Sequence, residues 1–316
     1  MIYQTSRKGA GGALHLTRNN AASLLAHMLA ILGASGKVGR ATIKKLTAQG
    51  AQVRAVVRET SGRADLEALG CEIAFADLRD KDAIRNAIKG ASAVQVICPV
   101  SPRAQDAGLD MANIIDSITA ALIAVDPETV LAISDYGAEV ESGSGITMIF
   151  HYMEASLSAL PGALIFLRSA EHMQNWARVF KPALETGVLP SFHHPVSKIF
   201  PTISAPDLGA IATELLLGKP AGSRRHIVHA EGPHRYSALD VAATLSEISG
   251  RQIVAHELPE TDWIPTLTRG GAGESYAELV RELYVAHNAG RIDVEPGGEV
   301  RFGTTELREA VRAMYQ

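Results

Sequence analysis

Residues 31–39 read Ile31-Leu32-Gly33-Ala34-Ser35-Gly36-Lys37-Val38-Gly39, and this stretch decides the fold. Its glycines are spaced G-x-x-G-x-x-G between a predicted strand, residues 29–32, and a predicted helix. In that setting Gly33 permits the tight turn, Gly36 lets the backbone approach a pyrophosphate, and Gly39 lets the helix pack on the sheet. The N-terminus of the helix offers free N–H groups to phosphates. We therefore predict a dinucleotide site built from Gly33, Ala34, Ser35, Gly36, Lys37, Val38 and Gly39. A glycine-rich turn without a ligand is the alternative.

Two other phosphate-binding loops do not fit this spacing. A P-loop has four residues between its first glycine and the Gly-Lys pair, followed by Ser or Thr. Here two residues separate Gly33 from Gly36, and Val38 follows Lys37. A kinase glycine-rich loop would lie in a hairpin rather than before a helix.

Beyond the loop, short apolar runs alternate with amphipathic segments. Strands are predicted at residues 29–32, 53–57, 71–75, 93–98, 130–133 and 163–167, with helices between them. Strands separated by helices of this length form a parallel sheet with helices on both faces. The predicted fold class is α/β, a Rossmann-type doubly wound parallel sheet with a smaller, mostly helical C-terminal lobe.

The pattern divides the chain into three parts. Residues 1–27 carry three basic residues and no acid, and we interpret them as a disordered N-terminal extension rather than a signal peptide. Residues 28–187 are the predicted NAD(P)-binding Rossmann domain. Residues 188–316 are the predicted substrate lobe, some segments of which return to the sheet. In this lobe we expect a helix at 208–217 capped by Asp207, a strand at 226–229, and a capping-box-like helix start at Ser237 and Asp240.

Composition excludes several classes of protein. The chain of 316 residues is 47% hydrophobic and 20% charged, with a net charge of -4. A nucleic-acid binder would show a basic surplus, so no direct nucleic-acid partner is expected. No uninterrupted apolar run reaches the roughly 18 residues of a membrane span, so no membrane partner is expected either. Two cysteines cannot make a disulfide framework, which predicts a cytoplasmic protein.

The end of the second predicted strand bears on the choice of cofactor. NAD enzymes usually place Asp or Glu there for the ribose 2′-hydroxyl, whereas this chain has Arg58 followed by Glu59. A guanidinium suits a 2′-phosphate, and Lys37 could add a second charge. We expect NADP(H) to be preferred, and Glu59 leaves NAD(H) as the alternative.

Further motifs resemble those of a known family. They are residues 53–58, Asp77 and Leu78, the Ser134-Asp135-Tyr136-Gly137 segment, residues 151–154, and Leu167-Arg168 leading to residues 173–175. With the glycine loop, they resemble the NmrA-like group of atypical short-chain dehydrogenase/reductases over nearly all of residues 28–316. The resemblance implies NADP(H) preference, with Asp77 and Leu78 flanking the adenine and Cys98 and Pro99 beside the cofactor. The group includes quinone reductases, related small-molecule reductases and regulators that bind the nucleotide without chemistry.

Catalytic residues are harder to assign. Short-chain dehydrogenases commonly use Tyr-x-x-x-Lys, and no tyrosine here has a lysine four residues later. Tyr136, after the fifth strand, and His151, near where relatives place a ribose-binding Lys or His, are the candidate catalytic residues; packing or capping is the alternative for each. Tyr136, His172 and Asn175 are the candidate substrate pocket. His193 and His194 are adjacent and unsupported by any other ligand motif, so no metal site is predicted.

These observations predict an NAD(P)H-dependent oxidoreductase that passes hydride from NADPH to a small electron acceptor, a quinone or similar molecule. Quinone reduction needs little beyond orientation and a proton, so it tolerates the missing Tyr–Lys pair. The alternative is a non-catalytic, NADP(H)-binding redox-sensing regulator, and only that interpretation requires a protein partner. Epimerase-like chemistry ranks third. The protein is expected to be a monomer or a homodimer.

Overall fold

The computed structural model describes residues 27–59, 63–218 and 224–315. The predicted N-terminal extension, apart from His27, lies outside these residues. The central element is an eight-stranded sheet in the order β12-β10-β6-β5-β4-β1-β2-β3, and all of its strand pairs are parallel. The predicted α/β class and parallel sheet are confirmed. Its strands are β1 (Met28–Leu32), β2 (Gln52–Val57), β3 (Glu72–Phe75), β4 (Ala93–Ile97), β5 (Thr129–Asp135), β6 (Ala163–Ser169), β10 (Arg225–Glu231) and β12 (Glu299–Phe302).

The strand order reverses direction at β1, which pairs with β2 on one side and with β4 on the other. Such a reversal separates the loops that follow the two strands and opens a crevice at their carboxyl ends, where open α/β sheets bind ligands. The glycine loop follows β1, and Cys98 and Pro99 follow β4. The sheet topology thus brings these two predicted cofactor segments to one place.

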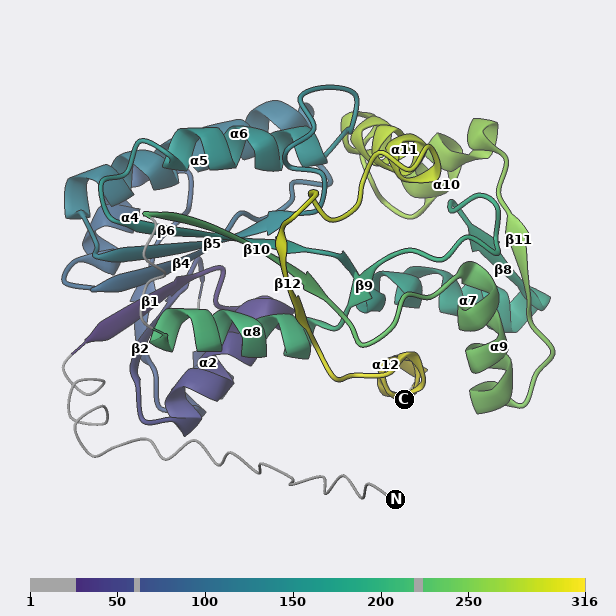
Figure 1. The fold of residues 1–316 in the computed structure, drawn as a ribbon, viewed down its shortest axis with the longest axis horizontal. Coiled ribbons are helices and arrows are strands. Elements are labelled where there is room, and N and C mark those ends of the chain that lie inside the picture. The colour runs from purple at the N-terminus through teal and green to yellow at the C-terminus, as the bar shows by residue number, and fades with distance from the viewer. Residues whose placement is uncertain (1–26, 60–62, 219–223, 316) are drawn as a thin grey trace, which may run out of the picture.

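Helices cover both faces of the sheet (Figure 1). One face carries α2 (Lys37–Ala48) and α8 (Ala205–Leu217), which pack closely against each other. The other carries α4 (Lys81–Ile88), α5 (Ala107–Val125) and α6 (Thr147–Leu157). A short helix, α3 (Arg63–Ala68), precedes β3.

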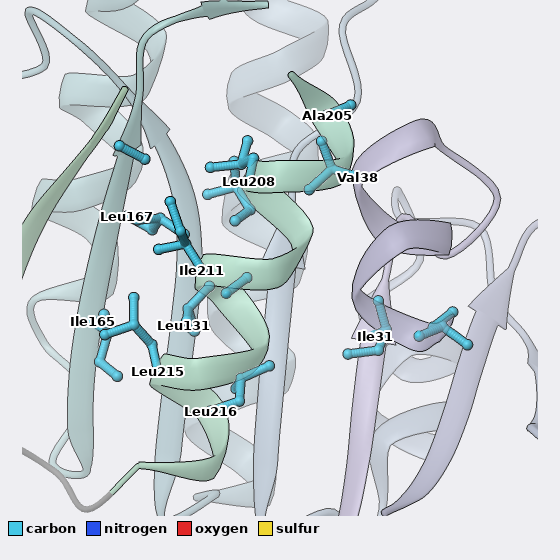
Figure 2. Close-up of a cluster of buried hydrophobic side chains, with 14 of the residues drawn as sticks. Ile31, Val38, Leu131, Ile165, Leu167, Ala205, Leu208, Ile211, Leu215 and Leu216 are labelled. Carbon is cyan, nitrogen blue, oxygen red and sulfur yellow. The ribbon is translucent and has the colours of Figure 1, made fainter. Parts of the chain in front are cut away.

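Figure 2 shows how α8 meets the sheet. Leu208, Ile211 and Leu215 of α8 and Leu131 and Leu167 of the strands belong to one cluster of buried apolar side chains. Each such side chain contributes about 1.5–3 kcal/mol by leaving water. Although α8 follows residue 187, it is part of the core of the sheet.

The remaining elements form a smaller lobe beside the carboxyl edge of the sheet (Figure 1). Its own apolar cluster includes Trp176, Phe180, Leu245 and Val311. The elements are β7 (Glu171–His172), α7 (Ala177–Thr186), β8 (Val188–Ser191), β9 (Thr202–Ile203), α9 (Ala238–Ser249), β11 (Val254–Glu257), α10 (Trp263–Arg269), α11 (Glu274–Asn288) and α12 (Leu307–Tyr315), with 3-10 turns at Met173–Trp176 and Glu260–Asp262. Strands β10 and β12 return from this half of the chain to the main sheet. The division at residue 187 into two domains stays a prediction.

Helix caps in this half were predicted with mixed success. Ser237 and Asp240 form the expected capping box at the start of α9. The predicted cap of α8 is wrong: Ser204 is the cap, and its hydroxyl accepts a hydrogen bond from the backbone N–H of Asp207 at 3.1 Å. The helix starts earlier because Pro206 is well suited to a first turn. The Asp207 carboxylate instead accepts from the N–H of Thr305 at 2.9 Å.

Helix α5 is long and apolar enough to cross a membrane by length and composition. Its sequence is not an uninterrupted apolar run, because Asp110 and Asp116 lie within it, so the sequence alone did not indicate a helix of this kind. One face of α5, including Met111, Ile115 and Ile118, is buried in the apolar cluster that it shares with the sheet. Core helices commonly have this composition when one side packs on a sheet.

Candidate active site at the carboxyl edge of the sheet

The glycine loop has the geometry that a bound pyrophosphate requires. Gly33 has a φ of 77°, in the left-handed region that favours glycine. Gly36 precedes α2 and no side chain caps the helix. A Cβ on Gly36 would have only the carbonyl oxygen of Gly33 within 4 Å, at 3.4 Å. The first N–H groups of α2 and the open space beside Gly36 therefore form a cradle that fits a phosphate group.

Two cavities adjoin this loop. The larger, of about 600 Å³, is lined by Gly36, Lys37, Val38 and Gly39 on the loop side. The smaller, of about 330 Å³, is lined by Gly33 and Ser35. Pro99 and Val100 line both cavities, so the two meet after β4. The two cavities lie on either side of the loop, an arrangement that could place the two halves of an elongated dinucleotide. Ala34 is fully buried and lines neither cavity.

The smaller cavity collects the residues predicted for the adenosine half: Arg58, Asp77 and Leu78. The Arg58 side chain is 66% exposed, and its nearest charged partner is Glu59, 3.8 Å from Nη2 to Oε1. Arg79 also lines this cavity, and sequence analysis missed it. Arg79 is held by Asp110 at 2.7 Å from Nη2 to Oδ2. Lys37 lines the larger cavity only, so the second cation beside Arg58 is Arg79 and not Lys37.

Cys98 lines the larger cavity and belongs to the apolar cluster that α5 shares with the sheet. Its thiol is buried, and burial raises the pKa of Cys98 to about 12, with a smaller contribution from Asp110 in the same direction. The sulfur is 3.7 Å from the carbonyl oxygen of Pro99. At neutral pH this side chain is therefore a protonated, apolar packing group rather than a reactive thiolate.

The larger cavity includes the three predicted substrate-pocket residues, Tyr136, His172 and Asn175. Burial lowers the pKa of His172 to about 4, although the nearby charge of Glu171 acts in the opposite direction. The imidazole is therefore neutral near pH 7. Apolar side chains, Ile97, Ile133, Phe150 and Val280 among them, line part of the wall, as in most small-molecule pockets.

The hydroxyl group of Tyr136 is directed away from this cavity. It donates a hydrogen bond to Oε1 of Glu231 at 3.1 Å, and Glu231 in turn pairs with Arg235 at 2.6 Å. Neither of these partners lines the cavity. Burial and the Glu231 carboxylate both raise the pKa of Tyr136 far above its usual value. This geometry does not present the phenol as a proton donor to an acceptor in the cavity.

The structure does not bring His151 to the site. His151 lies within α6, and its Nδ1 is 2.8 Å from the carbonyl oxygen of Ala138. It lines neither cavity. This contact ties α6 to the loop after β5, which is a packing role. His151 was assigned by analogy with relatives; α6 starts at Thr147, so His151 lies one turn inside the helix and does not cap it.

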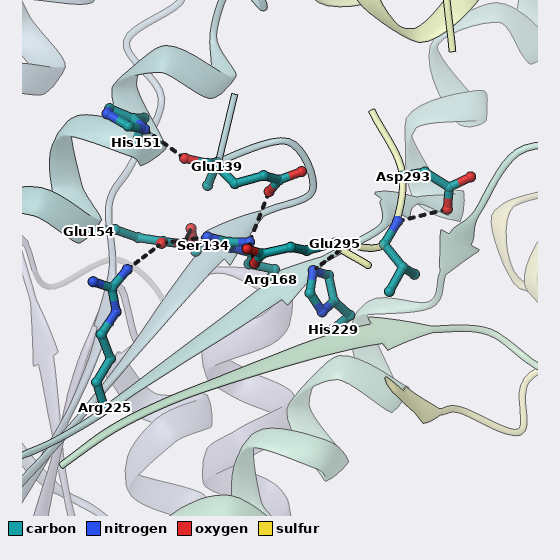
Figure 3. A network of polar contacts seen from close by, with 11 residues as sticks. Ser134, Glu139, His151, Glu154, Arg168, Arg225, His229, Asp293 and Glu295 are labelled. Atoms are coloured by element: carbon teal, nitrogen blue, oxygen red, sulfur yellow. Dashed lines mark hydrogen bonds and ion pairs between the residues drawn. The ribbon is translucent and has the colours of Figure 1, made fainter. Parts of the chain in front are cut away.

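An ionic network centred on the buried side chain of Arg168 connects β6 with α6 (Figure 3). The Arg168 guanidinium is 2% exposed and binds both carboxylate oxygens of Glu154 at 2.9 Å. Its Nη1 also lies 2.8 Å from both Glu139 and Glu295. Glu139, Glu295 and His229 are spaced closely enough to hold a metal ion. Arg168 already supplies positive charge to the two carboxylates, so the group is accounted for as an ion-pair network.

Several residues of the larger cavity were not predicted. They are Asp135, Glu171, Arg178, Tyr276, Tyr284 and His287. Asp135 could have been found, because it ends β5 and strand ends at this edge face the crevice. The others belong to the smaller lobe and reach the cavity only through tertiary folding. His193, which carried no functional prediction, pairs with Glu171 at 2.8 Å, whereas the ring of adjacent His194 packs on Trp263.

Comparison with known proteins agrees with this geometry. Residues 33–160 match the model of a family described as NAD(P)H-binding. Residues 33–160 are therefore similar to NAD(P)H-binding domains, and this similarity supports the predicted cofactor class.

Relatives over most of the chain are reductases. The chain is 27% identical to an NAD(P)H azoreductase of Xenophilus azovorans over 276 residues, which are 85% of this chain and 92% of the relative. It is 25% identical to quinone oxidoreductase 2 of Escherichia coli over 295 residues, 91% of this chain and 99% of the relative. The structure of an NADPH-dependent quinone oxidoreductase of E. coli complexed with NADPH has a TM-score of 0.76 at 22% identity, covering 92% of this chain and all of that one. These likenesses agree with the predicted resemblance.

Proposed function

We propose that this protein is an NAD(P)H-dependent reductase whose acceptor is a quinone or a similar small electron acceptor. The observation that carries the proposal is the pair of cavities on either side of the glycine loop, both lined by Pro99 and Val100. The smaller cavity suits the adenosine half of a dinucleotide. The larger has room for the nicotinamide half and for an acceptor beside it.

The names of the relatives support the type of acceptor. One is an azoreductase and another a quinone oxidoreductase. Azo groups and quinones are both conjugated acceptors that take up a hydride and a proton, so one cavity that holds a flat molecule can serve either. The largely apolar wall formed by residues such as Ile133, Phe150 and Val280 suits a flat, conjugated molecule.

NADP(H) is the proposed cofactor form. Arg58 lines the smaller cavity with most of its side chain exposed, and Arg79 lies in the same wall. A 2′-phosphate would meet two guanidinium groups there, and guanidinium is the side chain best suited to bidentate phosphate contacts. Glu59 lies 3.8 Å from Arg58 and Asp77 lies 3.6 Å from Arg79, so each guanidinium has one carboxylate beside it in this cavity. A 2′-phosphate would compete with these carboxylates for the two guanidinium groups.

Bound NAD(P)H supplies a hydride, and the residues of this chain hold and orient the cofactor and exclude water. The glycine loop and the first turn of α2 bind the pyrophosphate. Cys98 contributes to the wall of the larger cavity, and Pro99 to the walls of both. Neutral His172 and Asn175 offer polar contacts on the wall that an acceptor would occupy.

The alternative, a regulator that only senses the nucleotide, is less well supported. Such a protein needs no acceptor cavity, and here the larger cavity extends well beyond the loop to α11 residues such as Tyr276 and Tyr284. Both cysteines are free, as in a reducing compartment such as the cytoplasm. A protein partner is required only under the regulator interpretation.

The test is NADPH oxidation measured with a panel of quinones, azo dyes and ketones, alongside NADPH binding by calorimetry. We expect acceptor-dependent oxidation with quinones or azo compounds and little with simple ketones. Tight NADPH binding without oxidation by any acceptor would contradict the proposal and favour the regulator.

A further inference from the structure

We propose that Asp135 donates the proton that accompanies hydride transfer in this cavity. The inference rests on the proposed reductase function and adds a catalytic residue to it. Asp135 is the last residue of β5, at the carboxyl edge of the central sheet. It lines the larger cavity together with Gly36 and Pro99 of the cofactor segments and with His172 and Asn175 of the acceptor wall.

Within residues 27–59, 63–218 and 224–315, no arginine, lysine or histidine forms an ion pair with the carboxyl group of Asp135. The backbone N–H of the next residue, Tyr136, donates to the carbonyl oxygen of Ser169 at 3.1 Å. The other acidic residue that lines the cavity differs. Glu171 of β7 is bound by His193 at 2.8 Å and by the hydroxyl of Tyr284 at 3.0 Å.

Two carboxylates near Asp135 oppose its ionisation. Burial comes first in raising the pKa of Asp135, and the charges of Glu171 and Glu139 add to it. The N–H of Tyr136 acts in the opposite direction, and the resulting pKa is about 8. Near pH 7 most molecules therefore carry a proton on this carboxyl group, where an ordinary aspartate carries none.

The other titratable groups of the cavity are unsuited to donate a proton near neutral pH. Although burial alone would raise it, the charge and hydrogen bond of His193 bring the pKa of Glu171 down to about 2, so this group is ionised. Burial lowers the pKa of His172 and of His287 to about 4, so both are neutral bases. Burial raises the pKa values of Tyr136, Tyr276, Tyr284 and Cys98. The remaining charged side chains are the cations Lys37 and Arg178.

Asp135 also lies within electrostatic reach of the cavity wall opposite β5. Burial is the main cause of the raised pKa of Tyr276, a residue of α11, and Arg178 acts in the opposite direction. The charge of Asp135 adds a smaller contribution that raises this pKa. An acceptor held between β5 and α11 would thus lie beside the carboxyl group, which is the placement that proton transfer demands.

The proton balance is simple. Reducing a quinone to a hydroquinone adds one hydride and one proton. The hydride carries both electrons, and the proton moves from the carboxyl oxygen of Asp135 to the acceptor oxygen that gains charge. The O–H bond of Asp135 breaks as the new O–H bond forms. Asp135 remains as a carboxylate and regains a proton from water before the next turnover.

The experiment compares wild type with Asp135→Asn, which removes the acidic proton and keeps the size, and with Asp135→Glu, which restores an acid. Asp126→Asn is the matched control: it makes the same chemical change at an exposed residue before the amino end of β5, at the opposite edge of the sheet. NADPH affinity by calorimetry shows whether each variant is folded and retains its cofactor site.

For wild type we expect kcat/KM with a quinone to fall as the pH rises through about 8, because the donor is the protonated acid. Asp135→Asn should lose activity by on the order of a hundredfold and lose this pH dependence. Asp135→Glu should recover part of both, and Asp126→Asn should match wild type. Unchanged activity and pH profile in Asp135→Asn would overturn the inference and leave the proposed function standing.

A second measurement does not depend on turnover. Infrared difference spectra of wild type minus Asp135→Asn over a pH titration should show a protonated carboxyl band at pH 7 that disappears through about pH 8. A carboxyl group already ionised at pH 6 would overturn the inference even in an active enzyme. If none of the acceptors tested leads wild type to oxidise NADPH, the proposed function is overturned instead. The donor role of Asp135 is then overturned with it, whatever the spectrum shows.

Discussion

A side chain on Gly39 would place its Cβ 2.9 Å from the Cα of Ala34, and closer still to the carbonyl oxygen of Gly33. No residue but glycine fits there, because helix α2 packs directly on the turn that follows β1. Gly36, three residues earlier, has open space around its missing side chain. One glycine is thus required by the fold, and the other leaves room for a ligand.

This difference predicts opposite outcomes for two substitutions. Gly36→Val should abolish NADPH binding with little change in melting temperature, because the backbone at Gly36 has an extended conformation that valine accepts. Gly39→Val should lower the melting temperature strongly, since the turn itself must move. Thermal unfolding and calorimetric titration of both variants distinguish the two. A folded Gly36→Val variant with normal NADPH affinity would show that the loop is not the site.

Arg58 should determine the preference for NADPH over NADH. A hydrogen bond to a charged group contributes on the order of 1.5–3 kcal/mol, so Arg58→Ala should weaken NADPH by about ten- to a hundredfold. NADH, which lacks the 2′-phosphate, should change much less. Arg79→Ala should show the same selectivity, whereas Lys37→Ala should affect both nucleotides alike, because Lys37 lines the other cavity.

Titrating both nucleotides into wild type and the three variants checks this prediction. Equal affinity of wild type for NADH and NADPH, or equal losses of both in Arg58→Ala, would rule out Arg58 as the selecting residue.

Arg168 should matter for stability rather than for binding. Arg168→Met would leave the buried Glu154 carboxylate, 4% exposed, without the bidentate partner shown in Figure 3. Breaking one side of a buried ion pair costs about 3–5 kcal/mol. Arg281→Met is the control, because the Arg281 pairs with Glu260 and Glu278 lie at the surface and should contribute about 1 kcal/mol or less. Chemical denaturation measures both, and equal losses would contradict the prediction.

Tyr136→Phe tests whether the phenol hydroxyl group takes part in catalysis. Because the hydroxyl group is bound to Glu231 outside the cavity, we expect kcat close to that of wild type. The lost hydrogen bond to a carboxylate should lower the free energy of unfolding by about 1.5–3 kcal/mol. Steady-state kinetics and denaturation test the two halves of this prediction. A large loss of kcat in a stably folded variant would restore Tyr136 as a proton donor.

The features that sequence predicted are local ones. The glycine loop, the alternating strands and the capping box at Ser237 each depend on residues a few positions apart, so their chemistry is visible in the order of the chain. Strand ends at the carboxyl edge were predicted as well, which placed Arg58, Asp77 and Tyr136 near the crevice.

Side-chain direction and long-range packing were not predictable in this way. Tyr136 is at the expected strand end, yet its hydroxyl group turns to Glu231, which is 95 residues away in the chain. His151 was assigned by analogy with relatives and packs on Ala138 instead. Tyr276 and Tyr284 reach the cavity because α11 folds back over it, and nothing in their local sequence indicates this.

The most direct test of the central claim is a stoichiometric reduction without oxygen, in which purified protein, NADPH and a benzoquinone are mixed and both nucleotide and quinone are followed. The account predicts that one hydroquinone forms for each NADPH consumed, and that NADPH deuterated at C4 slows the chemical step. NADPH that binds but is consumed no faster with quinone than without it would contradict the account.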